Sequence, residues 1–114
     1  MAARRFGALD LSSPGTNVVL MSGTAGWDSS VNVRFTNRNS AASVAVRVAL
    51  VDAPAATALT SLTDADWIEY DTLIQPNEVL EDTGVVVPEN YSLVVSSDTT
   101  LVSVVAYGWE EQKV

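Results

Sequence analysis

The chain of 114 residues contains no cysteine and no histidine. Without cysteine there is no disulfide, no thiolate zinc site and no cysteine nucleophile. Without histidine the commonest general base and the imidazole metal ligands are missing too. Serine and threonine are plentiful, but no such base is present to activate them as nucleophiles. The sequence therefore offers no group of residues that argues for an enzyme, and we expect no metal centre and no cofactor.

Positive charge is scarce as well. Six Lys and Arg residues stand against 14 Asp and Glu, for a formal net charge of −8, and residues 48–112 contain no basic residue at all. An acidic surface repels phosphate backbones and anionic lipid headgroups, so we expect no nucleic-acid and no membrane partner. No apolar run approaches the roughly 20 residues that cross a bilayer. The basic start is not followed by an apolar segment, so we also expect no targeting peptide.

Long helical patterns are absent, and apolar residues recur with a period of two. Residues 31–37 and 43–51 alternate clearly, and the Asn-rich segment 37–40 between them favours a turn. This arrangement predicts an antiparallel hairpin. Further strands are predicted over residues 17–22, 67–74, 78–87, 91–97 and 101–109, with a bulge near Thr83-Gly84.

About seven short strands at this spacing predict an all-β fold. We expect a single antiparallel β-sandwich of jelly-roll or Greek-key type over residues 16–114, with residues 1–15 as an N-terminal arm or extension. The apolar runs 93–95 and 102–106 would promote aggregation at a bare sheet edge. We therefore expect them inside a sheet or under a neighbouring subunit.

The acidic segment 64–72, DADWIEYDT, is the strongest candidate for chemistry. Trp67 and Ile68 interrupt the alternating acids that a calcium loop requires, and no glycine follows. A looser calcium site that uses Asp64 and Asp66 remains an alternative. A short helical turn capped by Thr63 is the structural interpretation of the same residues.

Glu69 and Asp71 are spaced as a glycosidase pair could be, but a domain of this size predicts little cleft around them and no apolar pocket to raise a pKa. The favoured interpretation is structural. Alternation predicts that Ile68, Tyr70 and Thr72 face inward, with Trp67, Glu69 and Asp71 on the opposite face. Either acid could then pair with one of the three central cations, which are Arg34, Arg38 and Arg47.

The three tryptophans, Trp27, Trp67 and Trp109, allow two interpretations. They could form a platform that stacks on sugars, or they could serve packing in the core and at interfaces. Because they fall in a predicted loop, at a strand start and at a strand end, we favour packing. A fibre-type or adhesin-type module that binds a carbohydrate or receptor remains the alternative function.

Three segments carry a resemblance to a known family: FTNRNSAASVAVRVAL, DADWIEYDTLIQPNEVLEDTGVVV and VSVVAYGWEE. Together they make residues 31–111 similar to small virion proteins of tailed bacteriophages of the capsid decoration, or cement, type. The resemblance implies a non-enzymatic β-sandwich that binds the major capsid protein as a homotrimer. It also implies a place on the outer surface of the capsid, after assembly in the host cytoplasm. The loop at 52–60 and the basic start depart from the family pattern.

Cement proteins commonly dock through a terminal arm, so Arg4, Arg5 and Phe6 are candidates for docking on the shell. They combine two positive charges with an aromatic anchor. An ordinary frayed terminus is the alternative interpretation of these residues.

Overall fold

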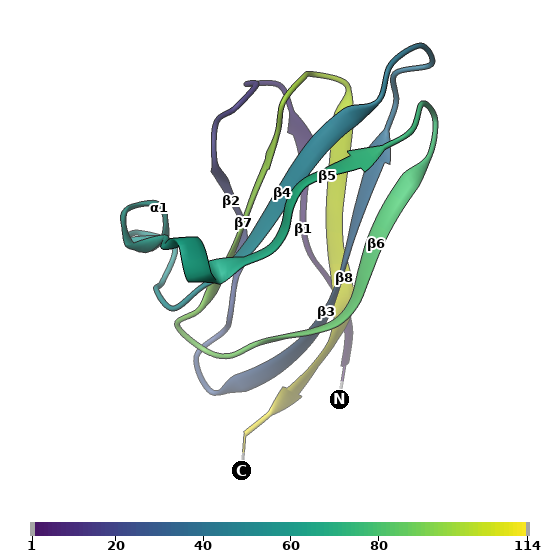
Figure 1. Ribbon diagram of the computed structural model, residues 1–114. Coiled ribbons are helices and arrows are strands. Elements are labelled where there is room, and N and C mark those ends of the chain that lie inside the picture. The colour runs from purple at the N-terminus through teal and green to yellow at the C-terminus, as the bar shows by residue number, and fades with distance from the viewer. Residues whose placement is uncertain (1, 114) are drawn as a thin grey trace.

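The computed structural model describes residues 2–113 as two four-stranded antiparallel sheets packed face to face (Figure 1). The predicted all-β sandwich is confirmed, with eight strands rather than about seven. A short helix α1 (Ala58–Ser61) and a 3₁₀ turn η1 (Asp64–Asp66) lie between the fourth and fifth strands. The strands are β1 (Ala2–Leu11), β2 (Val18–Ser22), β3 (Trp27–Asn37), β4 (Val44–Val51), β5 (Trp67–Ile74), β6 (Val79–Val87), β7 (Ser92–Ser97) and β8 (Val102–Gln112).

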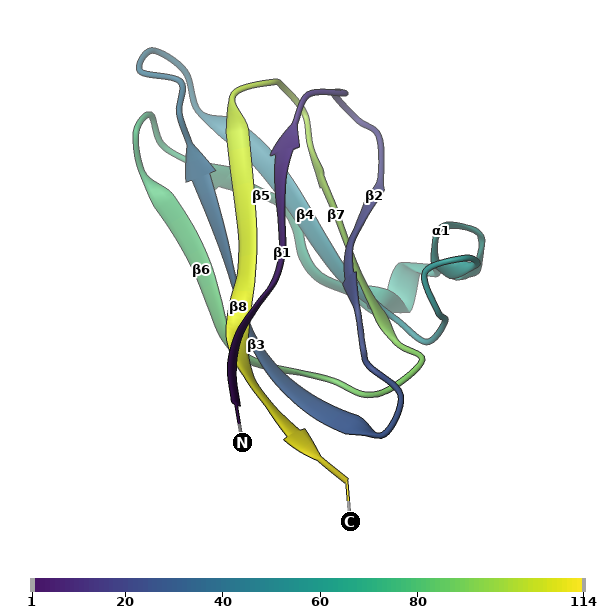
Figure 2. The same cartoon turned by 180° about the vertical axis from the view of Figure 1, so that it is seen from behind.

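The strand order is β1-β8-β3-β6 in the first sheet and β2-β7-β4-β5 in the second. The first half of the chain pairs with the second half in reverse order, as β1 with β8, β2 with β7, β3 with β6 and β4 with β5. This winding is the eight-stranded jelly roll. Figure 2, from behind, shows both chain ends at the same end of the sandwich.

The predicted hairpin between residues 31–37 and 43–51 is wrong. The two runs are strands, but β3 belongs to the first sheet and β4 to the second, so the turn between them crosses the sandwich. A polar turn between two alternating runs can join neighbours in one sheet or facing strands in two sheets. The local pattern is the same in both cases.

The core consists of apolar side chains from the inner faces of both sheets, with Phe35 and Leu93 the largest fully buried ones. The runs 93–95 and 102–106 lie in β7 and β8, which have a neighbour on each side. Their predicted place in the sheet interior is confirmed, and their backbone groups are not free to pair with another chain.

Residues 2–11, which we expected to belong to an arm, form the edge strand β1 and pair with β8 from Ala2 opposite Glu110 to Leu11 opposite Val102. The register shifts between Arg5 and Gly7. A Cβ on Gly7 would overlap the carbonyl oxygen of Leu20 in β2, so glycine allows the two sheets to approach closely here.

The predicted facing of β5 is wrong at residues 68–70. The side chains of Ile68 and Tyr70 are 41% and 56% exposed, whereas Glu69 is half-buried. Asp71 is exposed and Thr72 is half-buried, as predicted. The register with β4 shifts twice along this edge strand, and Asp71 has a φ of 53°. Each shift inverts the alternation, because one extra residue moves the following side chains to the other face. The bulge predicted near Thr83-Gly84 is confirmed by the corresponding shift between β3 and β6.

Candidate functional site

Asp71 of the acidic segment 64–72 forms an ion pair with Arg47 of β4 on the outer face of the second sheet. Arg47 donates from Nε to Asp71 Oδ1 at 2.6 Å and from Nη2 to Oδ2 at 3.1 Å. The guanidinium carbon lies 3.9 Å from the centre of the Tyr70 ring and 5.7 Å from that of Trp67. Hydrogen bonding to Arg47 lowers the pKa of the Asp71 carboxyl and raises the pKa of Arg47. Both groups are thus held in their charged forms, which suits a cross-strand tie rather than proton transfer.

The other two central arginines lie elsewhere. Arg38 donates to Asp10 at 2.5 Å and so joins the turn after β3 to the end of β1. Arg34 lies beside Glu81 in the register of β3 and β6, on the outer face of the first sheet. Within residues 2–113 it has no carboxylate within 4.0 Å. Neither of the two meets the acidic segment.

Glu69 faces a residue that the sequence pattern did not single out. It lies on β5, and Asp82 lies on β6, the edge strand of the opposite sheet. Burial, and to a smaller extent the interaction with the Glu69 carboxyl, together raise the pKa of Asp82 to about 6. Glu69 also accepts a hydrogen bond from the Thr72 hydroxyl at 2.7 Å. Because Glu69 and Asp82 lie close together in a partly buried place, ionising both carboxyls costs free energy.

The helical turn predicted before β5 is the 3₁₀ turn η1, with Thr63 at its N-cap. Asp66 accepts the backbone N–H of Thr63 at 2.8 Å and donates its own N–H to the Thr63 carbonyl at 3.1 Å. The Asp66 carboxylate therefore closes the turn. Across residues 2–113, no group of three or more His, Cys, Asp or Glu side chains is placed to hold a metal ion.

The three docking candidates do not form one patch. Arg4 donates to Glu110 at 2.9 Å and lies 5.2 Å from the centre of the Phe6 ring. Phe6 packs against the margin of the core. Both are therefore engaged within the subunit. Arg5 pairs in register with Tyr107 of β8, on the outer face of the first sheet.

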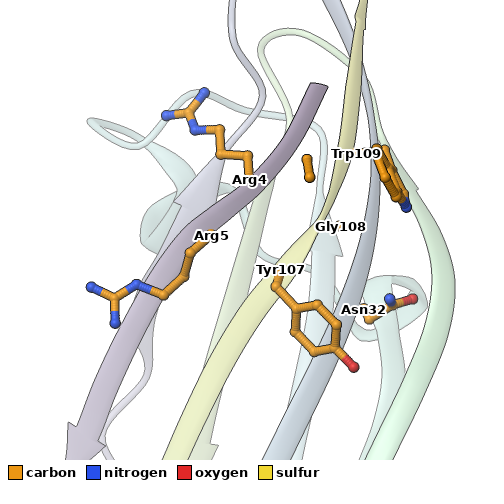
Figure 3. Close-up of a pocket in the computed structure, with 7 residues that line it drawn as sticks. Arg4, Arg5, Asn32, Tyr107, Gly108 and Trp109 are labelled. Atoms are coloured by element: carbon orange, nitrogen blue, oxygen red, sulfur yellow. The ribbon is translucent and has the colours of Figure 1, made fainter. Parts of the chain in front are cut away.

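That outer face carries a hollow of about 460 Å³. Tyr107 and Trp109 project from β8 with 36% and 52% of their surfaces exposed, and Asn32 lies beside them on β3 (Figure 3). In the same view Arg5 extends from β1 on the other flank. We call Arg5, Asn32, Tyr107 and Trp109 the aromatic shelf. The lining is completed by Ala3, Arg4 and Gly108.

Local contacts fix the shelf. The Tyr107 hydroxyl donates to Glu81, and this hydrogen bond raises the pKa of the phenol. Asn32 Oδ1 accepts the backbone N–H of Gly84 at 3.0 Å, in the bulge of β6. Between the two rings, a Cβ on Gly108 would overlap the carbonyl oxygen of Ser30, so β3 and β8 approach as closely as their backbones allow. The rings therefore stand on a tightly packed base.

The aromatic shelf could have been predicted in part from the sequence. We considered the three tryptophans only by the loop or strand end in which each one falls, and so overlooked the pairing of Trp109 with Tyr107. Tyr107 and Trp109 are two residues apart in a strand that alternates without interruption, so they had to share a face. Asn32 and Arg5 join them only through the order of the strands.

Comparison of the chain with protein-family models, with curated proteins and with solved structures gives no match. Among the described residues, no helix is both long enough and apolar enough to cross a membrane.

Proposed function

We propose that the protein is a non-enzymatic structural protein of a tailed-phage virion. In this role it decorates the outer surface of the head as a homotrimer bound to the major capsid protein. The resemblance of residues 31–111 to decoration proteins supports the proposal. Jelly rolls are also common among viral capsid and lectin domains, although a fold alone does not decide a function.

The observation that carries the proposal is an apolar surface on the edge strand β5. Ile68, Tyr70 and Leu73 are 41%, 56% and 64% exposed, and we call them the β5 patch. Scattered exposed apolar residues are ordinary, but a cluster on an edge strand, which has one side free to pair, is typical of an interface. A second copy of the chain is the partner that the homotrimer requires.

A closed trimer needs a heterologous contact, in which the β5 patch meets a different surface of the next subunit. At a net charge of −8 the copies repel one another, so the contact must come from buried apolar area. Leu73, the most exposed member, is the residue whose replacement should weaken it most.

The mass of the protein in solution and its binding to heads that lack it test the proposal. We expect the wild-type chain to be a trimer that cosediments with heads, and Leu73→Asp to be a folded monomer that does so weakly. Val79→Asp is the matched control, because Val79 is an exposed apolar residue on the other edge strand, β6. A wild-type monomer that ignores heads would contradict the proposal.

Docking through Arg4, Arg5 and Phe6 stays a prediction. Deleting residues 1–8 would remove most of β1 and uncover β8, so single substitutions are the cleaner test. Arg5→Ala changes a side chain with no ion pair among the described residues, whereas Arg4→Ala also breaks the contact with Glu110.

A further inference from the structure

We propose that the aromatic shelf on the outer face of the first sheet is a binding site for a neutral hexopyranose within a glycan chain. The proposal is independent of the head-decoration role, because it uses a different sheet and different residues from the β5 patch.

The two rings provide the apolar part of such a site. Tyr107 and Trp109 are successive outward residues of β8, so their Cα atoms are about 7 Å apart along the strand. A sugar ring presents C–H groups on its faces, and these pack on the faces of aromatic side chains. Tyr and Trp serve well where one end of the side chain is apolar and the other is wet.

The polar groups of the shelf are placed to bind hydroxyls. Asn32 has its amide oxygen occupied by the N–H of Gly84, which leaves its two Nδ2 protons for an outside acceptor. Among the described residues, neither the Trp109 indole N–H nor the Arg5 guanidinium has a hydrogen-bond partner. Asn32 lies beside the rings, whereas the Arg5 guanidinium extends away from them on the other flank (Figure 3). A mostly apolar surface with a few polar groups is the usual composition of a small-molecule site.

The charges around the shelf favour a neutral sugar over an acidic one. Glu81 holds the Tyr107 hydroxyl, and an adjoining hollow of about 140 Å³ reaches Trp109. Three carboxylate residues line that hollow: Asp28, Glu110 and Glu111. Glu110 is paired with Arg4 and Asp28 with Lys113, so the repulsion of a carboxylate-bearing sugar comes mainly from Glu111 and Glu81. The hydroxyls of a neutral sugar can donate to the same carboxylates.

The site is also held in place before any ligand arrives. β8 is paired on both sides, and the close approach at Gly108 ties it to β3. The hydrogen bond to Glu81 fixes the tyrosine ring, so little side-chain entropy remains to be lost on binding.

A glycan array that carries neutral and sialylated oligosaccharides tests the proposal with the full-length chain. We expect binding to neutral glycans, followed by quenching of tryptophan fluorescence when the same free oligosaccharide is titrated in solution. Trp109→Ala should weaken this binding at least tenfold, and Asn32→Ala should weaken it to a smaller extent. Tyr70→Ala removes an equally exposed aromatic residue from the other sheet and should leave the affinity unchanged.

Three results would overturn the proposal: no neutral glycan bound at millimolar concentration, binding confined to sialylated glycans, or full affinity in a folded Trp109→Ala variant. A shell seated on this face would cover Arg5 together with Trp109. Loss of head binding in both Arg5→Ala and Trp109→Ala, without glycan binding by the wild type, would therefore assign the face to the shell. Leu73→Asp separates the two proposals, because a monomer that has lost the trimer should still bind the free oligosaccharide.

Discussion

β8 and β5 both carry aromatic residues on an outer face, yet only β8 follows its sequence pattern. In β8, buried and exposed side chains alternate from Val102 to Trp109. In β5 the pattern breaks twice, and Glu69 lies toward the interior while Ile68 lies outside. The difference lies in the neighbours, because β8 has a strand on each side and β5 is an edge.

A strand with a ladder on both sides cannot slip by one residue without breaking hydrogen bonds along its whole length. An edge strand loses only local pairing when a bulge forms, and its free side tolerates the distortion. Alternation therefore predicts facing well in the centre of a sheet and poorly at its edge. The aspartate at 71 helps, since Asp adopts a positive φ more readily than most residues.

The largest expected difference between the two strands comes from placing a charge at an inward position of β8 and at an outward position of β5. Val104→Asp in β8 buries an unpaired carboxylate, and we expect a loss of more than about 4 kcal/mol in the free energy of unfolding. Leu73→Asp in β5 should change the stability of the monomer by less than about 0.5 kcal/mol. Urea unfolding followed by tryptophan fluorescence measures both, at a concentration where the chains are monomeric. Similar losses at the two sites would contradict the assigned facing.

A smaller test uses two glycines. Gly108→Ala should push β3 and β8 apart and cost about 3 kcal/mol, because the added methyl group meets backbone rather than a movable side chain. Gly84→Ala, at the bulge of the edge strand β6, meets open space and should cost about 1 kcal/mol for its positive φ of 67°. Thermal and urea unfolding of the two variants check this order, and the reverse order would argue against tight packing beneath the shelf.

A pH test addresses the contact between Glu69, on the inner face of β5, and Asp82 of β6. The folded-state pKa of Asp82 is about 6, above its ordinary 3.8, so the folded chain holds this proton more tightly than the unfolded chain. The resulting stabilisation is complete below about pH 4 and is lost as the pH rises through 6. Asp82→Asn should therefore match the wild type near pH 4 and be more stable than it at pH 7.

Glu69→Gln should reduce the same pH dependence in part, because it removes the neighbouring acid but not the burial. Unfolding free energies measured from pH 4 to 7 test both variants. An unchanged slope in Asp82→Asn would show that other groups set the pH dependence.

The smallest expected effect concerns the outer face of β8. Hydrogen bonding to Glu81 raises the pKa of the Tyr107 phenol above 10, so this tyrosine should ionise late in an alkaline absorbance titration. Tyr107→Phe should remove the late component and leave the fold intact. Tyr70→Phe, which changes the exposed tyrosine of β5, should leave that component in place.

Much of the architecture could be predicted from local pattern. The sandwich, the interior place of 93–95 and 102–106, the turn closed by Asp66 and the bulge near Gly84 all depend on residues close in sequence. The contact between Arg47 and Asp71 was among the ion pairs that could be predicted, because the chain has few cations to pair with the acids. The predicted hairpin was wrong, because a turn does not show which sheet the next strand joins. The predicted facing of residues 68–70 in β5 was wrong, because an edge strand can bulge.

The sequence by itself determined that this chain is an acidic all-β domain without cysteine or histidine, because composition and a period of two need no partner in space. Only the tertiary structure decided the jelly-roll winding, which sets which strands are central and which are edges. It also brought Glu69 to Asp82, and Asn32 and Arg5 to the two rings of β8. These neighbours are distant in sequence. They meet only because distant strands pair, and a local sequence pattern does not show which strands pair.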